Sequence, residues 1–267
     1  MRFCENKRVI YSREIVAHAR QMVEQAESLD HHAIRHQDPL AGSLRMGAIP
    51  TLSPYLMPLI LKPMVQRLPQ SRLVLSEEIT DILLARLRRH EIDAALLATP
   101  VLDDDLEVLP LFKEPFWVAY PRNHPFYEKE KIVLRDLHNA NLLLLAEGHC
   151  LAEQAMDVCR IKERQPRGEL ADLRASSLET LIQLVGAGYG ITLIPALAIR
   201  GSWSAGSGVV PQPLAVADAS RRVSLVFRNS FPRRAALQAF AELICDNLPN
   251  TVRRPGRSRR VKKKPRR

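Results

Sequence analysis

The sequence predicts an α/β protein built as two lobes with a cleft between them. Strand-like apolar runs alternate with helix-like segments in two successive rounds, and extended segments join the rounds. Aromatic residues make up only 5% of the chain and aliphatic residues dominate, which suits an α/β protein better than a β-sandwich. With 267 residues, the chain is long enough for two modest domains with hydrophobic cores.

The first round of elements starts near residue 44. Pro54 follows Ser53 at the start of a helical pattern, and proline is favoured at the first position of a helix. Short apolar runs on both sides of this helix have the length and aliphatic content of strands. We therefore expect helices at residues 53–68 and 81–89, and strands at residues 44–49, 73–75, 94–97, 108–112 and 116–120.

The second round follows a turn with prolines at both ends, residues 121–125. Gly148 ends an apolar run, and the residues after it are good helix formers. Ser176, Ser177 and Glu179 form a capping box, which opens a further helix. We therefore expect helices at residues 151–159, 176–187 and 232–247, and strands at residues 142–145, 191–194 and 223–227.

The segment before the first strand predicts a coiled-coil helix. From residue 12 on, apolar residues follow the 4-3-4-3 spacing of a coiled-coil seam, at Ile15, Ala19, Met22, Ala26 and Leu29. Pro39 and Gly42 end this helix. We expect a dimerisation helix and linker at residues 12–43, supported by other contacts because the seam spans only about two heptads.

The charge of the chain is concentrated at its C-terminal end. The chain has 39 Lys and Arg residues against 29 Asp and Glu residues, and residues 253–267 hold ten of the basic ones and no acid. The remaining body is therefore neutral. We expect residues 251–267 to be a disordered basic tail, either solvated without further role or a weak binder of polyanions.

Several classes of protein do not fit this sequence. It contains no apolar stretch long enough to span a membrane, and no apolar segment follows a charged N-terminus as in a secretory signal. Its four cysteines are too few and too scattered for a disulfide framework. We expect a cytoplasmic protein that does not bind membranes.

Cys150 and Cys159 are the most informative pair of residues. They lie nine residues apart, and the predicted helix joins them. Cys150 would lie in its first turn, where free backbone N–H groups and the helix dipole favour a thiolate. A straight helix separates the two residues by about 13 Å, whereas the Cα atoms of a disulfide lie within about 7 Å. Oxidation could join them only by unwinding the helix, as in a redox switch; the alternative is two inert buried thiols.

Three further candidate residues follow predicted strands, where ligands bind in α/β sheets. Thr51 and His149 follow the strands at residues 44–49 and 142–145, and Thr80 precedes a helix that it could cap. Helix capping, turn formation and an exposed loop histidine are the alternative interpretations. The glycine-rich segment at residues 186–190 follows a helix rather than a strand, and no zinc or hydrolase motif is present. We therefore expect no cofactor, no metal ion and no catalytic residue.

Four segments resemble the hydrogen-peroxide-sensing members of the LysR-type transcriptional regulators. The resemblance covers about residues 1 to 250, and its most specific part is Gly148-His149-Cys150-Leu151 with a second cysteine nine residues on. The other segments lie at residues 44–51, 174–181 and 190–198. The resemblance implies a periplasmic-binding-protein-like (type 2) regulatory domain at residues 44–250. Lobe I would hold residues 44–120 and 222–250, and lobe II residues 121–221.

The resemblance also implies a role for each candidate residue. Cys150 matches the cysteine that peroxide oxidises to a sulfenic acid, and Cys159 matches the one that then forms a disulfide with it. Thr51, Thr80 and His149 match residues that hold peroxide beside the thiol, whereas Arg222 resembles the arginine that favours the thiolate. The implied partners are hydrogen peroxide, a cellular thiol reductant, further copies of the chain as a dimer or tetramer, promoter DNA and RNA polymerase.

The N-terminal end departs from the family pattern. Members of the family begin with a winged helix-turn-helix, and residues 1–11 resemble only the last part of its wing. We therefore expect no sequence-specific DNA binding by this polypeptide alone. Two other functions stay open at this stage. One is a LysR-type module that binds a small organic ligand and has inert cysteines, and the other is a thiol peroxidase enzyme.

Overall fold

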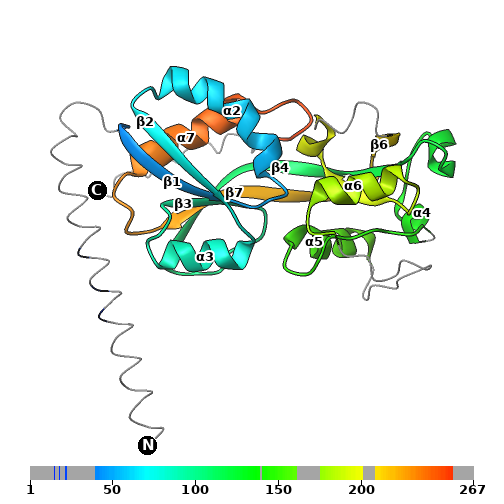
Figure 1. The fold of residues 1–267 in the computed structure, drawn as a ribbon, viewed down its shortest axis with the longest axis horizontal. Helices are drawn as coiled ribbons and strands as arrows, with labels where there is room; N and C mark the ends of the chain where they lie inside the picture. The colour runs from blue at the N-terminus through cyan, green and yellow to red at the C-terminus, as the bar shows by residue number, and fades with distance from the viewer. Residues whose placement is uncertain are drawn as a thin grey trace, which may run out of the picture.

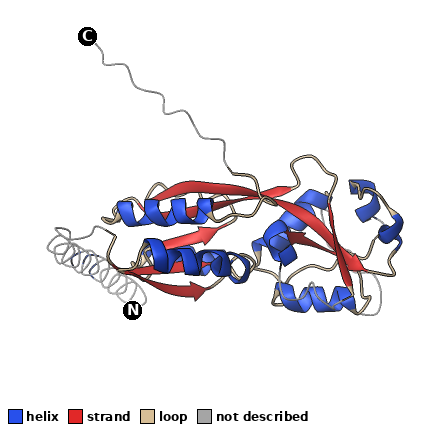
Figure 2. Cartoon of the chain, turned by 90° about the horizontal axis from the view of Figure 1, so that it is seen from above, coloured by secondary structure: helices blue, strands red, loops and turns tan. Residues whose placement is uncertain are grey.

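The computed structural model describes Ile15, His18 and Met22 and residues 40–138, 140–160, 175–200 and 208–254. These residues form two lobes, joined by two long strands that run from one lobe into the other (Figure 1; Figure 2). In this part of the chain no helix is long and apolar enough to cross a membrane.

The first lobe is a mixed sheet of parallel and antiparallel strands, covered by helices on both faces. Strand β1 (Gly42–Ala48) pairs in parallel with β2 (Ser71–Glu77) and with β3 (Ala94–Leu97). Helices α2 (Ser53–Arg67) and α7 (Arg234–Asp246) pack together on one face, and α3 (Thr80–Arg88) covers the other (Figure 1). The carboxyl ends of β1, β2 and β3 therefore meet at the edge that faces the second lobe.

Strand β4 (Leu106–Pro121) belongs to both lobes. Its first part pairs antiparallel with β7 (Ser220–Arg228), and from Phe116 on it pairs with β5 (Thr192–Pro195) and β6 (Val209–Pro213). The strands expected at residues 108–112 and 116–120 are thus one strand, with a register shift between Pro110 and Phe112. The change of sheet falls near Phe116, before the lobe boundary expected at residue 120.

The second lobe carries the cysteine helix. Helix α5 (Cys150–Cys159) and helix α6 (Leu178–Gly186) form as predicted, and Ser177 caps α6 by accepting a hydrogen bond from the Thr180 amide. The prediction of a strand at residues 142–145 is wrong. This segment makes only isolated bridges with two different neighbours, Leu142 with Ile191 and Leu145 with Ala175, because it crosses from one to the other.

The sequence patterns also missed several elements. These are strand β6 and three short helices, namely the 3-10 helices η1 (Pro125–Glu128) and η2 (Ala196–Arg200) and helix α4 (Leu134–His138). The first residues of the tail expected from residue 251 belong to the folded body. Arg253 exchanges two backbone hydrogen bonds of 2.8 Å with Lys113, so the folded body extends at least to residue 254.

The predicted N-terminal and C-terminal segments lie mostly outside the described residues. This holds for the wing remnant at residues 1–11, for most of the linker at residues 12–43 and for the tail from residue 255 on. Two positions of the predicted seam, Ile15 and Met22, are described; both are helical, and their side chains are 66% and 71% exposed.

Candidate functional site

A small pocket surrounds the start of α5, at the junction of the two lobes. Four of the residues predicted from the sequence meet there: Thr51, Thr80, His149 and Cys150. Main-chain and apolar groups complete its wall, from Ile49, Pro50, Ile79 and Gly148. The pocket is tight, because its lining residues pack closely together.

Local sequence explains how the pocket forms. Thr51 lies in the loop after β1, and Thr80 begins α3 directly after β2, so both project from the same edge of the sheet. Gly148 has a positive φ of 90°, which lets the chain turn sharply into α5 and brings His149 and Cys150 to the pocket. A Cβ atom at Gly148 would lie 3.3 Å from Cδ1 of Ile79, so the turn also fits closely against the lining.

The Cys150 thiol is buried, and burial has the largest effect on its pKa. Its side chain is 8% exposed, and loss of solvent raises the pKa of the thiol above its ordinary value. The positive charge of Arg221 and the hydroxyl of Thr80 oppose this rise in pKa, and Glu153 adds to it. Desolvation of the Cys150 thiol thus opposes the thiolate expected at the helix start, while Arg221 and Thr80 favour it.

The arginine beside the pocket is Arg221, and the assignment to Arg222 needs correction. Arg221 is buried; it donates hydrogen bonds of 2.9 Å from Nη1 to Oγ1 of Thr51 and from Nη2 to the Thr51 carbonyl oxygen. Its Nε also donates to Oε2 of Glu114 at 2.9 Å, within a fully buried ion pair. Successive residues of β7 point to opposite faces, so a shift of one position leaves Arg222 exposed on the other face.

The two threonines and the histidine differ in their bonding. Thr51 is 2% exposed and accepts from Arg221, so its own hydroxyl proton stays free to donate. Thr80 does not cap α3, because the N-cap position belongs to Ile79. Within the described residues its buried hydroxyl completes no hydrogen bond, although it lies near enough to Cys150 to lower the pKa of the thiol. Burial lowers the pKa of His149, so its imidazole is mostly neutral at pH 7.

Cys159 lies outside the pocket, at the other end of α5. Its side chain is fully buried, and burial raises the pKa of its thiol to about 11. Because α5 is continuous from Cys150 to Cys159, its rise separates the two residues by about 13 Å. His138 Nε2 forms a hydrogen bond of 2.9 Å with the Cys159 carbonyl oxygen, which holds this end of the helix. Both thiols are free in this structure.

Three residues near the site were missed by the sequence interpretation. Besides Arg221 these are Glu114 and Gln154, whose amide Nε2 donates to the Ala98 carbonyl oxygen at 2.7 Å and ties α5 to the end of β3. The alternation of Arg221 with the apolar Val223 is the signal that places Arg221 on the inner face of β7. No group of three or more metal-binding side chains occurs within the residues that the structure describes.

Comparison with known proteins agrees with this geometry. The model of the LysR substrate binding domain matches residues 37–249. A "probable hydrogen peroxide-inducible genes activator" of Mycobacterium avium is 38% identical over 236 residues, which cover 86% of this chain and 73% of that protein. The "DNA-binding transcriptional dual regulator OxyR" of Escherichia coli is 36% identical over 230 residues, covering 86% of this chain and 74% of that protein.

Solved structures show the same fold. A hydrogen-peroxide-bound cysteine-to-serine mutant of OxyR from Corynebacterium glutamicum superposes with a TM-score of 0.75 at 35% identity, and the match covers 86% of this chain and 71% of that one. The sequence identities, the shared fold and the extent of the family match all indicate the same family. The chain therefore belongs to the LysR substrate binding domain family.

Proposed function

We propose that this chain is the sensor part of a transcription regulator that responds to hydrogen peroxide through Cys150. One observation carries the proposal: the Cys150 thiol lies in a tight pocket with Thr51 and Thr80, and the buried guanidinium of Arg221 lies beside this pocket, bonded to Thr51. The relatives named as hydrogen peroxide-inducible activators, and the peroxide-bound OxyR structure, support the same assignment.

The first step is oxidation of Cys150. Its thiolate attacks one peroxide oxygen, so that a sulfur–oxygen bond forms, the oxygen–oxygen bond breaks and hydroxide leaves. The hydroxide takes up one proton and leaves as water, and sulfur becomes a sulfenic acid. The hydroxyls of Thr51 and Thr80 are placed to donate hydrogen bonds to the leaving oxygen, while the charge of Arg221 stabilises the thiolate.

The second step joins the two cysteines. The Cys159 sulfur attacks the Cys150 sulfenic acid, a disulfide forms, and the hydroxyl group leaves with the thiol proton as water. The two sulfurs cannot meet across a continuous α5, so the helix must unwind at residues 148–160. A cellular thiol reductant reverses the reaction by exchange, which restores both thiols and the helix.

The change in α5 has consequences for assembly and transcription. The side chains of Ile15 and Met22 lie seven residues apart on one face of a helix and are largely exposed, which suits pairing with a second copy of the chain. We infer a homo-oligomer that acts in the cytoplasm, with promoter DNA and RNA polymerase as partners of the whole regulator.

Trapping of the sulfenic acid tests the proposal. In the variant Cys159→Ser, one equivalent of hydrogen peroxide should yield a chain that reacts once with dimedone, at Cys150. Adding Cys150→Ser to this variant should abolish the adduct, and adding Cys245→Ser should leave it unchanged because Cys245 lies outside the pocket. An adduct at another cysteine, or none at all, would reject the assignment.

A measurement of steady-state peroxide consumption separates this function from that of a thiol peroxidase. A sensor is oxidised once per chain and then waits for slow reduction, whereas a peroxidase turns over continuously with dithiothreitol as reductant. We expect one equivalent of peroxide to be consumed rapidly, followed by consumption close to the rate without protein.

A further inference from the structure

The Cys159 end of α5 is held by a side chain from outside the helix. His138, the last residue of α4, forms a hydrogen bond of 2.9 Å from Nε2 to the Cys159 carbonyl oxygen. A carbonyl oxygen only accepts, so Nε2 of His138 carries the proton and donates. Cys159 is the last residue of α5, and its carbonyl lies beyond the reach of the amides within the helix. The His138 ring therefore supplies a donor that α5 itself lacks.

The backbone after Cys159 indicates that this end of α5 depends on contacts from outside. Arg160 follows the helix with a φ of 54° and a ψ of 38°, a left-handed conformation in which a helix usually has glycine. For a residue with a side chain this conformation is costly, and it persists only where the surroundings hold it. Cys159 is fully buried and His138 binds its carbonyl, so both contacts fix the chain just before Arg160.

Helix α4 gives His138 a fixed support. Leu137, the residue before it, is fully buried. The Asp136 carboxylate accepts a hydrogen bond of 2.9 Å from the Val133 amide and pairs with Lys129 at 2.8 Å. The His138 side chain itself is exposed, so it contributes little to the core. Its bond thus links α5 to a firmly held segment, and its replacement should leave the packing of the lobe intact.

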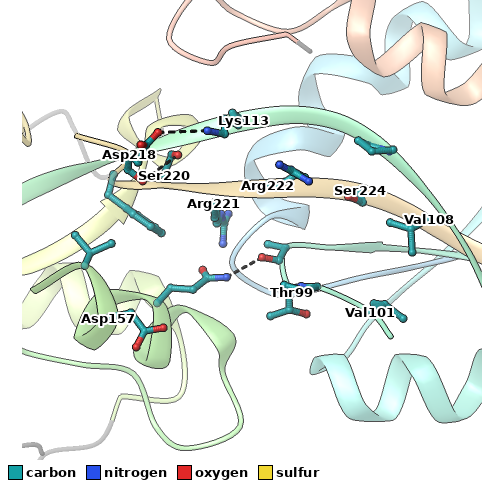
Figure 3. A pocket seen from close by; sticks show the side chains of 16 residues that line it. Thr99, Val101, Val108, Lys113, Asp157, Asp218, Ser220, Arg221, Arg222 and Ser224 are labelled. Carbon is teal, nitrogen blue, oxygen red and sulfur yellow. Dashed lines mark hydrogen bonds and ion pairs between the residues drawn. The ribbon is translucent and has the colours of Figure 1, made fainter. Parts of the chain in front are cut away.

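The bond at the Cys159 end is remote from the pocket at Cys150. The pocket lies at the opposite end of α5, about 13 Å away along the helix. Between the two ends, Gln154 holds α5 to Ala98, in the wall of a cavity of about 740 Å³ beside β4 and β7 (Figure 3). Loss of the His138 bond therefore leaves both the pocket and the contact between Gln154 and Ala98 in place.

We propose that His138 is a positioning residue for the second oxidation step: its bond to the Cys159 carbonyl restrains α5 and sets how fast the disulfide forms. Cys159 reaches the Cys150 sulfenic acid only after this end of α5 opens, and opening breaks the bond from His138. The bonds made and broken at sulfur stay those described above, with water as the product that leaves, because His138 acts on the backbone alone. This inference rests on the proposed function.

Two variants of His138 test the restraint by separating the two oxidation steps. His138→Leu removes the donor, and His138→Gln keeps an N–H donor on a side chain of similar reach. The reduced chain receives one equivalent of hydrogen peroxide, samples are quenched at intervals with dimedone and an alkylating agent, and mass spectrometry gives both rates. In His138→Leu the disulfide should form about threefold faster, the effect of one partly exposed hydrogen bond, while the sulfenic acid forms at the unchanged rate. His138→Gln should restore the disulfide rate of the unchanged protein.

Asn141→Ala is the matched control for loss of a bond from a side chain to the backbone. Asn141 Nδ2 donates to the Tyr189 carbonyl oxygen at 2.7 Å, in the same lobe but between two segments outside α5. Both oxidation rates should therefore stay unchanged in this variant. Equal acceleration of disulfide formation in Asn141→Ala, or in His138→Gln, would overturn the inference, because the donor at His138 would then not be the cause.

Amide hydrogen exchange of the reduced chain gives a second measurement that needs no oxidation. The amides at the Cys159 end of α5 should exchange about threefold faster in His138→Leu than in the unchanged protein, because this end opens more often. Unchanged exchange, or an unchanged disulfide rate in His138→Leu, would overturn the inference and leave the proposed function standing. Failure of Cys150 to oxidise in the unchanged protein would overturn both.

Discussion

Arg221 joins three parts of the molecule through one buried guanidinium. It binds Glu114 on β4 and the hydroxyl and carbonyl oxygens of Thr51. The Oε1 atom of Glu114 in turn accepts a hydrogen bond of 2.8 Å from the Leu197 amide. A buried ion pair contributes little net stability when intact, because desolvation of both groups offsets their attraction. Removal of one partner is costly, since it leaves the other charge buried alone.

The first prediction separates Arg221 from Arg222. Arg221→Gln should lower the free energy of unfolding by about 3 to 5 kcal/mol and slow oxidation of Cys150, because Glu114 loses its partner and the thiolate loses a positive charge. Arg222→Gln should change the free energy of unfolding by less than about 0.5 kcal/mol. Urea denaturation and stopped-flow oxidation measure the two effects; a larger effect of Arg222→Gln would restore the original assignment.

The second prediction concerns the pH dependence of Cys150. The thiolate is the nucleophile, and burial raises the pKa of the thiol, so the reactive fraction stays small at neutral pH and grows as the pH rises. In Cys159→Ser, the rate of Cys150 oxidation should increase by about tenfold per pH unit between about pH 6 and pH 8. A rate that levels off below about pH 7 would instead indicate a lowered pKa and contradict the dominance of burial.

At the scale of elements, the turn into α5 decides how the pocket is built. Gly148 and Gly188 both have positive φ values, 90° and 87°. A Cβ atom at Gly148 would approach Ile79, whereas one at Gly188 would meet nothing within 4 Å. The two positions thus share the same backbone strain on substitution and differ only in their surroundings.

The third prediction uses this matched pair. Gly148→Ala and Gly188→Ala should each lower the free energy of unfolding by about 1 to 2 kcal/mol, the cost of a left-handed conformation for alanine. Only Gly148→Ala should also slow oxidation of Cys150, because it alone crowds the pocket. Thermal unfolding measures the change in stability, and dimedone labelling measures the rate of Cys150 oxidation. Equal slowing of Cys150 oxidation in both variants would show that crowding of the pocket is not the cause.

Local patterns predicted the helices and strands better than the contacts between them. Cys150 and Thr80 each open a helix and Thr51 lies in the loop after β1, so local signals were enough to find them. His149 was inferred from a strand that does not form, and it reaches the pocket because it directly precedes α5. Arg221 was misplaced by one residue, since the choice between neighbouring arginines depends on which face of β7 is buried. The raised pKa of Cys150 depends on burial by distant segments, and no local motif reports it.

At the scale of the whole molecule, side chains tie the two lobes together around α5. Gln154 binds Ala98 across the lobes, and the Tyr55 hydroxyl on α2 donates to Glu179 on α6 at 2.7 Å. Burial and this carboxylate raise the pKa of Tyr55, so the phenol remains a donor across the working pH range. Unwinding of α5 would break the hydrogen bond between Gln154 and Ala98 and so change the contact between the lobes.

The fourth prediction concerns assembly through the exposed apolar side chains near the N-terminus. Ile15→Asp combined with Met22→Asp should weaken self-association by at least about tenfold, because charges on a coiled-coil seam oppose pairing. Leu102→Asp is the control, since Leu102 is 99% exposed but lies in the loop between β3 and β4. Sedimentation equilibrium measures both variants. Unchanged association in the double variant would place the interface elsewhere.

The disulfide between Cys150 and Cys159 is the central claim, and peptide mapping tests it most directly. The reduced chain receives one equivalent of hydrogen peroxide, free thiols are alkylated at once, and the digest is analysed by mass spectrometry without reduction. We predict one dominant cross-linked species, which joins Cys150 to Cys159 within the same chain despite the helix between them. A fully alkylated Cys150, or a cross-link mainly to Cys4 or Cys245, would contradict the account.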